Sequence, residues 1–337
     1  MKTLGHYWSG INKAWSRREW IGAGVAGLGA AAGWGVQAQT KWPDKPIKLV
    51  VGFPPGGATD VVARIVSQPL ADALGTSVVI DNRPGAASNV AMAEVARAPA
   101  DGYTILVAPT TIESANPFLY KASANPATDL MAVAGLCRFQ LHMVVRNGFP
   151  AKDVAELVAY AKKNPGKMTY SSAGAGTTPH LIGELFLQQA GIQVVHVPYK
   201  GSAPALQAVL TGEVDFVMDP GISFQHVRAG KANMFAVASP SRSKQFPDIG
   251  TLGEKGVSGI DYDTWAGTWA PAGTPDDVRA RLSKALSQVM ALPEVQQKMQ
   301  ALSGEAMYMD TPQYRQMLNK ETAAFSGVIK NRKILVE

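Results

Sequence analysis

Three turns rich in small residues, each leading into an expected helix, are the part of the sequence best suited to chemistry. They span residues 53–60, 83–89 and 171–180, and each follows an expected strand. The first amide groups of a helix lack partners within the helix and carry a partial positive charge. Small residues let a ligand approach this backbone, so two or three such ends can hold an anion without an arginine. One such turn alone is more typical of an ordinary connection, but three together favour a shared anion site.

The candidate ligand-binding residues lie in these turns, at the helix starts after them, or at the end of a later strand. They are Phe53, Gly56, Gly57, Ala58, Thr59, Asp60, Ser88, Asn89, Ser172, Gly174, Gly176, Thr177, Thr178, His180 and Asp219. Asp60 favours the helix dipole but would repel an anion, and a pair with Arg64 four residues later is an equally good interpretation. Asp219 either binds an amino or hydroxyl group of the ligand or, as is more usual for aspartate, caps a turn. His180 either borders the ligand or has a packing or capping role.

Other chemistries find little support in the sequence. No Gly-Lys-Ser/Thr follows the turns, as a phosphate loop would require, and Pro179 interrupts the dinucleotide pattern that Gly174 and Gly176 begin. No two histidines have the spacing of metal ligands, and there is no Gly-x-Ser-x-Gly elbow. We therefore assign no catalytic residue, no metal and no cofactor.

The segments that position these turns alternate between strand and helix, which predicts an α/β fold. Expected strands cover residues 47–53, 78–80, 103–108, 141–145, 168–171, 194–197, 214–218 and 234–238, and expected helices cover residues 59–74, 89–97, 154–163, 178–190 and 203–210. Thr59, Thr178 and Thr274 are expected to cap helices, and Pro69 is expected to kink or shorten the first of them. The fold class is therefore α/β with two lobes, each a doubly wound sheet flanked by helices, and the last helices pack back on the first lobe.

The N-terminal residues 1–38 are expected to be a signal peptide. A basic region, an Ala/Gly-rich apolar region and a small-residue cleavage site follow one another there. The Arg17-Arg18 pair favours the twin-arginine route over general secretion. An uncleaved anchor is the alternative, but residues 22–35 are too short and too rich in glycine for a good membrane-spanning helix.

Charge and cysteine content exclude further classes. The net charge of the whole chain is +6, and Lys2, Lys13, Arg17 and Arg18 lie in the leader, so the exported protein is only mildly basic. A nucleic-acid-binding protein would show a dense basic face, whereas a mild positive charge is compatible with attracting small anions. Cys137 is the only cysteine, so no internal disulfide can form, and its apolar surroundings in the sequence indicate a buried position.

With these residues in view, the chain resembles the Bug-type receptors, the substrate-binding proteins of tripartite tricarboxylate transporters. The resemblance covers nearly the whole exported chain and is carried by residues 42–47, 54–60, 82–86, 101–104, 174–181, 197–201 and 270–275. It implies a monomeric Venus-flytrap receptor of the periplasm, with residues 39–140 plus 262–337 as lobe 1 and residues 141–261 as lobe 2. It also implies that backbone amides, small side chains and water hold a carboxylate, and it adds Tyr199 to the candidate ligand-binding residues.

The sequence departs from the family pattern at two places. After residues 82–86 the family usually has two glycines, whereas Ala87 and Ser88 stand here, and residues 218–221 are also unusual. Both departures bear on the identity of the ligand rather than on the receptor role.

The expected function is capture of a small carboxylate and its delivery to the membrane subunits of a tripartite tricarboxylate-type transporter. One alternative is a periplasmic enzyme on the same scaffold, which a bound chromophore or metal would reveal. The other is a co-receptor for a signalling kinase, which needs the same closure of the lobes.

Overall fold

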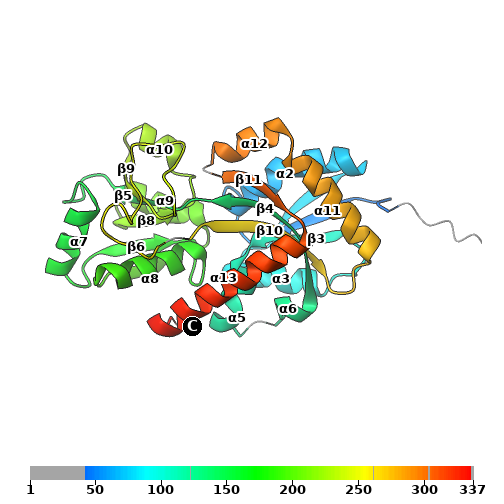
Figure 1. Ribbon diagram of the computed structural model, residues 1–337, viewed down its shortest axis with the longest axis horizontal. Coiled ribbons are helices and arrows are strands. Elements are labelled where there is room, and N and C mark those ends of the chain that lie inside the picture. The colour runs from blue at the N-terminus through cyan, green and yellow to red at the C-terminus, as the bar shows by residue number, and fades with distance from the viewer. Residues whose placement is uncertain (1–41, 122, 261, 303, 335–337) are drawn as a thin grey trace, which may run out of the picture. The chain divides into compact units, whose positions relative to one another are not determined.

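Two β-sheets with helices on both faces organise the part of the chain that the structure describes (Figure 1). The structure is a computed structural model and describes residues 42–334 except 122, 261 and 303. The expected signal peptide, residues 1–38, lies outside the described residues. The α/β class with two lobes is confirmed, and we call the six-stranded sheet with its helices the first lobe and the five-stranded sheet with its helices the second lobe.

The sheet of the first lobe has the strand order β11-β4-β10-β3-β1-β2. Its strands are β1 (Ile47–Val51), β2 (Val78–Asn82), β3 (Thr104–Pro109), β4 (Leu130–Phe139), β10 (Thr264–Pro271) and β11 (Gly304–Met309). Strand β1 pairs in parallel with β2 and β3, and β10 adds to β3 in the antiparallel direction. Strands β1 and β3 are mostly apolar and buried on both faces, as the inner strands of a parallel sheet require, whereas the edge strand β2 is partly exposed.

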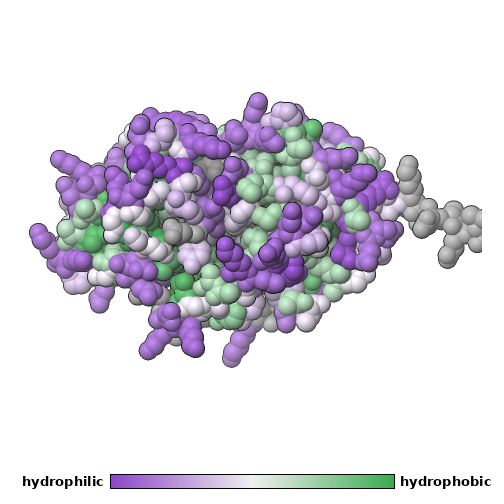
Figure 2. Space-filling model, viewed as in Figure 1, coloured by the Kyte–Doolittle hydropathy of each residue, from purple (hydrophilic) through white to green (hydrophobic). Residues whose placement is uncertain are grey.

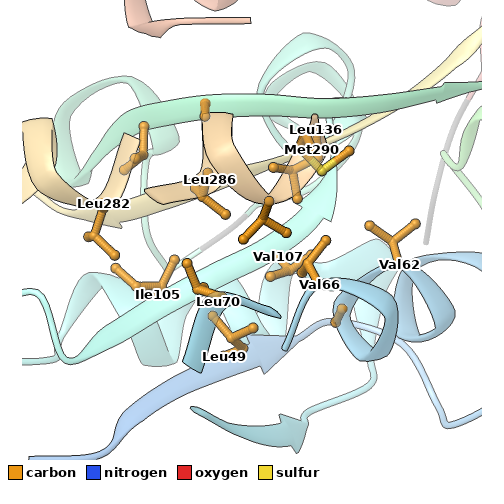
Figure 3. Close-up of a cluster of buried hydrophobic side chains, with 14 of the residues drawn as sticks. Leu49, Val62, Val66, Leu70, Ile105, Val107, Leu136, Leu282, Leu286 and Met290 are labelled. Carbon is orange, nitrogen blue, oxygen red and sulfur yellow. The ribbon is translucent and has the colours of Figure 1, made fainter. Parts of the chain in front are cut away.

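Two layers of helices cover the faces of this sheet. The apolar sides of α2 (Ala58–Leu74), α11 (Asp276–Met290) and α12 (Pro293–Gln300) form one core with it, and α3 (Asn89–Ala96), α4 (Thr111–Ser114) and α13 (Thr311–Arg332) form the other. Figure 3 shows the first core, where Val66 and Leu70 of α2 and Leu286 of α11 lie beside Leu49 of β1. Two short helices, α5 (Asn116–Leu119) and α6 (Pro126–Asp129), lie between β3 and β4 in the sequence.

The sheet of the second lobe has the strand order β7-β6-β8-β5-β9. Its strands are β5 (His142–Arg146), β6 (Thr169–Ser172), β7 (Val195–Pro198), β8 (Phe216–Asp219) and β9 (Ala232–Val237). Helices α7 (Val154–Lys163) and α8 (Thr178–Ala190) pack in one core, α9 (Ser202–Thr211) packs in the other, and α10 (Phe224–Arg228) follows β8.

Two strands of the first sheet connect the lobes. β4 leads into the second lobe and β10 returns from it, and the two are antiparallel neighbours over most of their length (Figure 1). The last part of α13 adds an apolar cluster in which Phe325 and Ile329 pack with Leu119 of the first lobe and Leu181 of the second. The residues at which the chain divides between the lobes, 140/141 and 261/262, stay a prediction.

Several local predictions were wrong at helix starts. The N-cap of α2 is Gly57 rather than Thr59, that of α8 is Thr177 rather than Thr178, and that of α11 is Pro275 rather than Thr274. The three observed N-cap residues, Gly57, Thr177 and Pro275, make no capping hydrogen bond with a side chain. At α2, Asp60 in the first turn accepts the amide of Gly56, which precedes the helix, so the first amides of α2 have no side-chain cap.

Helix α2 also runs through Pro69 to Leu74 and is not shortened. A proline inside a helix costs roughly 3 kcal/mol. Val66 and Leu70 lie on either side of Pro69 and are both buried in the core, so tertiary packing offsets this cost.

Cys137 in β4 is fully buried, as expected, and burial raises the pKa of its thiol. The visible face of the molecule is mainly hydrophilic (Figure 2). Within the described residues, every helix is either too short or too polar to span a bilayer.

Candidate functional site

Two neighbouring cavities lie between the lobes and share Phe53 and Ala173 in their walls. The larger, which we call the large chamber, has a volume of about 200 Å³, and its walls include Pro54, Pro84, Gly85, Ala86, Ala87 and Tyr120 of the first lobe and Gly174, Ala175, Pro198, Tyr199 and Lys200 of the second. The smaller, the small chamber, has a volume of about 40 Å³. Residues from both lobes line each chamber, so both cavities lie at the boundary between the lobes.

The small chamber is where two helix starts meet. Gly57, Ala58 and Thr59 bring the first turn of α2 to it, and Thr177 and Thr178 bring the first turn of α8 from the opposite lobe. The first amide donors of both helices have no acceptors inside their helices, and both ends carry partial positive charge. The arrangement therefore concentrates donors and positive potential from two lobes on one small volume, which suits an anionic oxygen.

Two threonine hydroxyls in the wall of the small chamber lack partners. Thr178 has only 1% of its surface exposed, and its Oγ1 has no hydrogen-bond partner among the described residues. Thr264, at the start of β10, lines the same chamber, and its Oγ1 is buried and unpartnered too. A buried hydroxyl without a partner costs about 1–3 kcal/mol, so these two groups mark positions where a ligand atom would be stabilised.

The turn of the first lobe is held from behind by a buried carboxylate. Asp60 is 1% exposed and accepts hydrogen bonds from Gly56 N at 2.9 Å, Arg64 Nε at 2.8 Å and Asn82 Nδ2 at 2.9 Å. Burial acts to raise the pKa of Asp60, but the hydrogen bonds from Arg64, Gly56 and Asn82 outweigh it and hold the pKa below its usual value. Asp60 does not line either chamber, and its pair with Arg64 is the alternative that the sequence left open.

The turn at residues 86–88 forms another wall of the large chamber in a strained conformation. Ala86, Ala87 and Ser88 have φ angles of 46°, 49° and 76°, a left-handed region that costs other residues than glycine roughly 1–2 kcal/mol each. Ala86 and Ala87 line the large chamber. Ser88 does not line it and packs on Gly52, where an added Cβ would lie 2.1 Å from Ser88 Oγ. The two residues that depart from the family pattern therefore take the conformation that glycine prefers.

The turn of the second lobe rests on two stacked histidines. Gly176 N donates to His180 Nδ1 at 2.9 Å, and Ser172 Oγ lies 2.7 Å from His196 Nε2. The two imidazole rings are parallel within 8°, with centroids 4.0 Å apart. Burial lowers the pKa of His180 to about 4, and burial together with the neighbouring His180 lowers the pKa of His196 to about 3. Both rings are therefore neutral at neutral pH, and Nδ1 of His180 is the acceptor that the Gly176 amide needs.

The Ser172–His196 pair has the composition of a nucleophile and a base, but its setting does not suit catalysis. Ser172 is fully buried, so a substrate cannot approach its hydroxyl. A histidine with a pKa of about 3 is also a poor base near neutral pH. Ser172 Oγ instead contacts both the carbonyl and the amide of Gly174, so the pair fixes the shape of the turn. Within the described residues no group of three or more His, Cys, Asp and Glu is placed to hold a metal ion.

Asp219 occupies the turn after β8 and does not reach the chambers. Its Oδ2 accepts the amides of Gly221 at 2.8 Å and Ser223 at 3.0 Å, and burial raises the pKa of its carboxyl. The structure thus shows the turn-capping alternative, while the neighbouring Pro220 lines the small chamber. A direct role of Asp219 toward a ligand stays a prediction.

Half of the predicted site residues line the chambers. Those that do are Phe53, Gly57, Ala58, Thr59, Gly174, Thr177, Thr178 and Tyr199. Those that do not are Gly56, Asp60, Ser88, Asn89, Ser172, Gly176, His180 and Asp219. Most of the second group hold the turns from behind: Gly56 donates to Asp60, and Asn89 Nδ2 donates to the Ala86 carbonyl at 2.8 Å.

Sequence reasoning missed other lining residues. Tyr120 and Thr264 lie far from the three turns in the sequence, and no local pattern marks either of them. Pro54, Pro84 and Lys200 lie inside the segments that carry the family resemblance. The family resemblance therefore marked the segments of these three residues, although they were not among the predicted site residues.

Comparisons with known proteins agree with this geometry. The family model described as "Tripartite tricarboxylate transporter family receptor" matches residues 62–334. The structure of the periplasmic binding protein BugD is 32% identical, with a TM-score of 0.83, and the match covers 88% of this chain and 100% of BugD. Rpa4515 of R. palustris, solved with adipate, is 32% identical with a TM-score of 0.84 over 87% of this chain and 99% of its own.

A third solved structure is MatC (Rpa3494) from Rhodopseudomonas palustris with bound malate. It is 29% identical to this chain, with a TM-score of 0.81, and the match covers 86% of this chain and 100% of MatC. The family model spans most of the chain, and the fold matches these proteins over nearly their whole lengths. The chain therefore belongs to the tripartite tricarboxylate transporter family receptors and is a Bug-type solute-binding protein.

Proposed function

We propose that this protein captures a small carboxylate between its two lobes in the periplasm and delivers it to a tripartite tricarboxylate-type membrane transporter, without chemical turnover. Membership of a receptor family supports this proposal. The carboxylates named for two structural neighbours, adipate and malate, support the ligand class.

One observation carries the proposal: the starts of α2 and α8, from different lobes, face the same small chamber. A carboxylate there would accept hydrogen bonds from the first amides of both helices and from the hydroxyl of Thr178. Charge-assisted hydrogen bonds of this kind are about twice as strong as neutral ones. Because the donors come from both lobes, a bound carboxylate favours the closed arrangement, which is the event that a transporter can recognise.

The large chamber would take the rest of the ligand. Its wall is formed by the rings of Phe53, Tyr120 and Tyr199 together with prolines and alanines, and Lys200 is its one charged residue. Such a wall suits an apolar body, with Lys200 available to a second polar group.

Thermal-shift and calorimetric screening of the purified mature protein tests the function. The panel includes malate, adipate, citrate, benzoate and glutamate, with the corresponding neutral amides as matched controls. A carboxylate present at a hundred times its Kd should stabilise the protein by about 2.7 kcal/mol, and its amide should not. Mass spectrometry of the protein after native purification identifies any carboxylate that it retains. Failure of every carboxylate to stabilise the protein would contradict the proposal.

Transport and signalling are separated in cells. Deleting the receptor should abolish uptake of the radiolabelled carboxylate found in the screen, and the wild-type receptor supplied in trans should restore it. Normal uptake with loss of carboxylate-dependent transcription would instead indicate the kinase co-receptor.

A further inference from the structure

Tyr120 separates the large chamber from a second, open hollow at the surface. It follows α5 in the first lobe and lines the large chamber. It also lines a surface groove of about 630 Å³, whose wall includes Arg97 and Lys121. Among the described residues, Ala86 is the other residue that lines both spaces, so Tyr120 and Ala86 lie between the chamber and the groove.

Tyr120 also connects the lobes. Its hydroxyl donates a hydrogen bond to the carbonyl oxygen of Ala175, in the turn of the second lobe. Burial raises the pKa of Tyr120 to about 12, so the hydroxyl remains a donor over the physiological range. The ring packs on the backbone of Gly176, where an added Cβ would lie 3.0 Å from Tyr120 Cε2 and 2.9 Å from Leu119 Cδ1. No side chain larger than hydrogen fits between Tyr120 and this turn.

The segment that carries Tyr120 is tied to the strained turn of its own lobe. Asn116 Nδ2, at the start of α5, donates to the carbonyl oxygen of Ala87 at 2.9 Å. Leu119 packs beside Leu181 of α8 in the apolar cluster that includes the end of α13. Residues 116–120 therefore contact two walls of the large chamber, one from each lobe.

We propose that Tyr120 is the latch and the gate of the receptor: its hydrogen bond to Ala175 holds the lobes closed, and its ring closes the path between the large chamber and the outer groove. The proposal rests on the function proposed above. A carboxylate in the chamber would leave through the groove once the Tyr120–Ala175 bond breaks and the ring turns aside. Tyr120 is then a residue that sets how long the ligand stays, not one that holds the carboxylate itself.

Hydrogen–deuterium exchange tests the latch without any ligand. The mature protein is compared with Tyr120→Phe, which removes only the hydroxyl, and with Tyr308→Phe, which removes a hydroxyl that bonds to Ser283 within the first lobe at 2.6 Å. Losing one such hydrogen bond should speed exchange of the amides in residues 172–178 about two- to tenfold in Tyr120→Phe. Tyr308→Phe should leave these amides at the wild-type rate. Equal exchange of residues 172–178 in all three proteins would overturn the latch.

Release kinetics test the gate, with adipate and malate as probes. Dissociation of a bound probe should be about two- to tenfold faster from Tyr120→Phe, and faster again from Tyr120→Leu, which also removes the ring. Equal release from Phe and Leu variants would show that the ring is no barrier and would overturn the gate. If the wild-type protein binds neither probe nor any other carboxylate, the function proposed above fails, whereas the exchange comparison still decides on the latch.

Discussion

The two turns that meet at the small chamber are supported in opposite ways. In the first lobe a charged group holds the turn, because Asp60 binds Gly56 N and Arg64 with its pKa held below the usual value. In the second lobe neutral groups do so, because His180 accepts the Gly176 amide only as an uncharged imidazole and His196, also neutral, pairs with Ser172. The same task of presenting a helix start is thus done by a carboxylate that must stay ionised and by histidines that must not ionise. The two supports should therefore fail under different conditions.

Acidification is expected to produce the largest difference. For His180, the folded pKa of about 4 lies below the ordinary value of 6.5, so between these values the unfolded chain binds a proton that the folded chain does not. Stability from this group is present above pH 6.5 and is lost as the pH falls toward 4. A shift of this size corresponds to about 3 kcal/mol. Asp60 has the depressed pKa of a carboxylate, so its contribution is lost only below pH 3.8.

Urea unfolding at pH 7, 5.5 and 4.5 measures this loss. His180→Asn keeps an acceptor for the Gly176 amide but does not titrate, so between pH 7 and 4.5 its stability should fall about 2.5 kcal/mol less than that of the wild type. The difference between the two proteins reports His180 together with its effect on the pKa of His196. It cancels the contributions of His142, whose pKa burial lowers to about 4, and of Glu321, whose pKa burial raises to about 7. Parallel pH profiles for the two proteins would show that the histidine support is not pH-sensitive.

Removing the charged support is expected to have the next largest effect. Asp60→Ala leaves the Gly56 amide without its acceptor and removes one of the two acceptors of Asn82 Nδ2, which should cost about 1–3 kcal/mol in the free energy of unfolding at pH 7. Asp72→Ala, on the exposed side of the same helix, is the matched control and should change stability by less than about 0.5 kcal/mol. If both variants unfold at the same urea concentration, the carboxylate does not support the turn.

The threonines at the two helix starts, Thr178 and Thr59, allow the two lobes to be compared in ligand binding. Thr178→Val replaces an unpartnered, buried hydroxyl by a methyl group of similar shape, so the free protein should be as stable as the wild type or more stable. Its affinity for the carboxylate identified by screening should fall about tenfold or more, because hydrogen bonds to charged groups contribute about 1.5–3 kcal/mol. Isothermal titration calorimetry compares it with Thr59→Val from the first lobe. Unchanged affinity in Thr178→Val would place the carboxylate elsewhere.

The smallest expected effect concerns the strained turn of the first lobe. Ala87→Gly relieves a left-handed conformation but adds entropy to the unfolded chain, so the net gain in stability should be about 0.5 kcal/mol. Ala73→Gly, on the exposed side of α2, should instead lose about 1 kcal/mol. Urea unfolding of both variants checks the opposite signs. A loss of stability in Ala87→Gly would mean that the methyl group of Ala87 contributes packing that outweighs the strain.

The sequence was sufficient for the architecture because the fold depends on patterns that are local. The apolar strand at Ile47–Val51 and the helix that ends before Gly75 are recognisable from their own residues. Helix starts were misplaced by one or two residues, since a threonine near a helix start resembles a cap whether or not its side chain binds the backbone. At α2 the side chain of Asp60, inside the first turn, binds the preceding Gly56 amide and does not cap the helix.

The site was predictable only in part, for a geometric reason. Helix-start chemistry correctly pointed to the turns that line the chambers, including Gly57 and Thr178. It could not tell which side of a turn each side chain faces, so it included Ser88 and Asp219, which do not line the chambers. Tyr120 and Thr264 reach the chambers from distant segments, and only tertiary structure brings them there.

The complete burial of Cys137 has a practical consequence. Its thiol is inaccessible and its pKa is raised, so maleimide reagents at neutral pH will not modify it. Cysteines introduced at exposed positions of the two lobes, such as Asp72 of α2 and Lys163 of α7, can therefore carry a fluorescent donor and acceptor in an otherwise native sequence. Opening and closing of individual receptor molecules can then be recorded without first rebuilding the strand that connects the lobes.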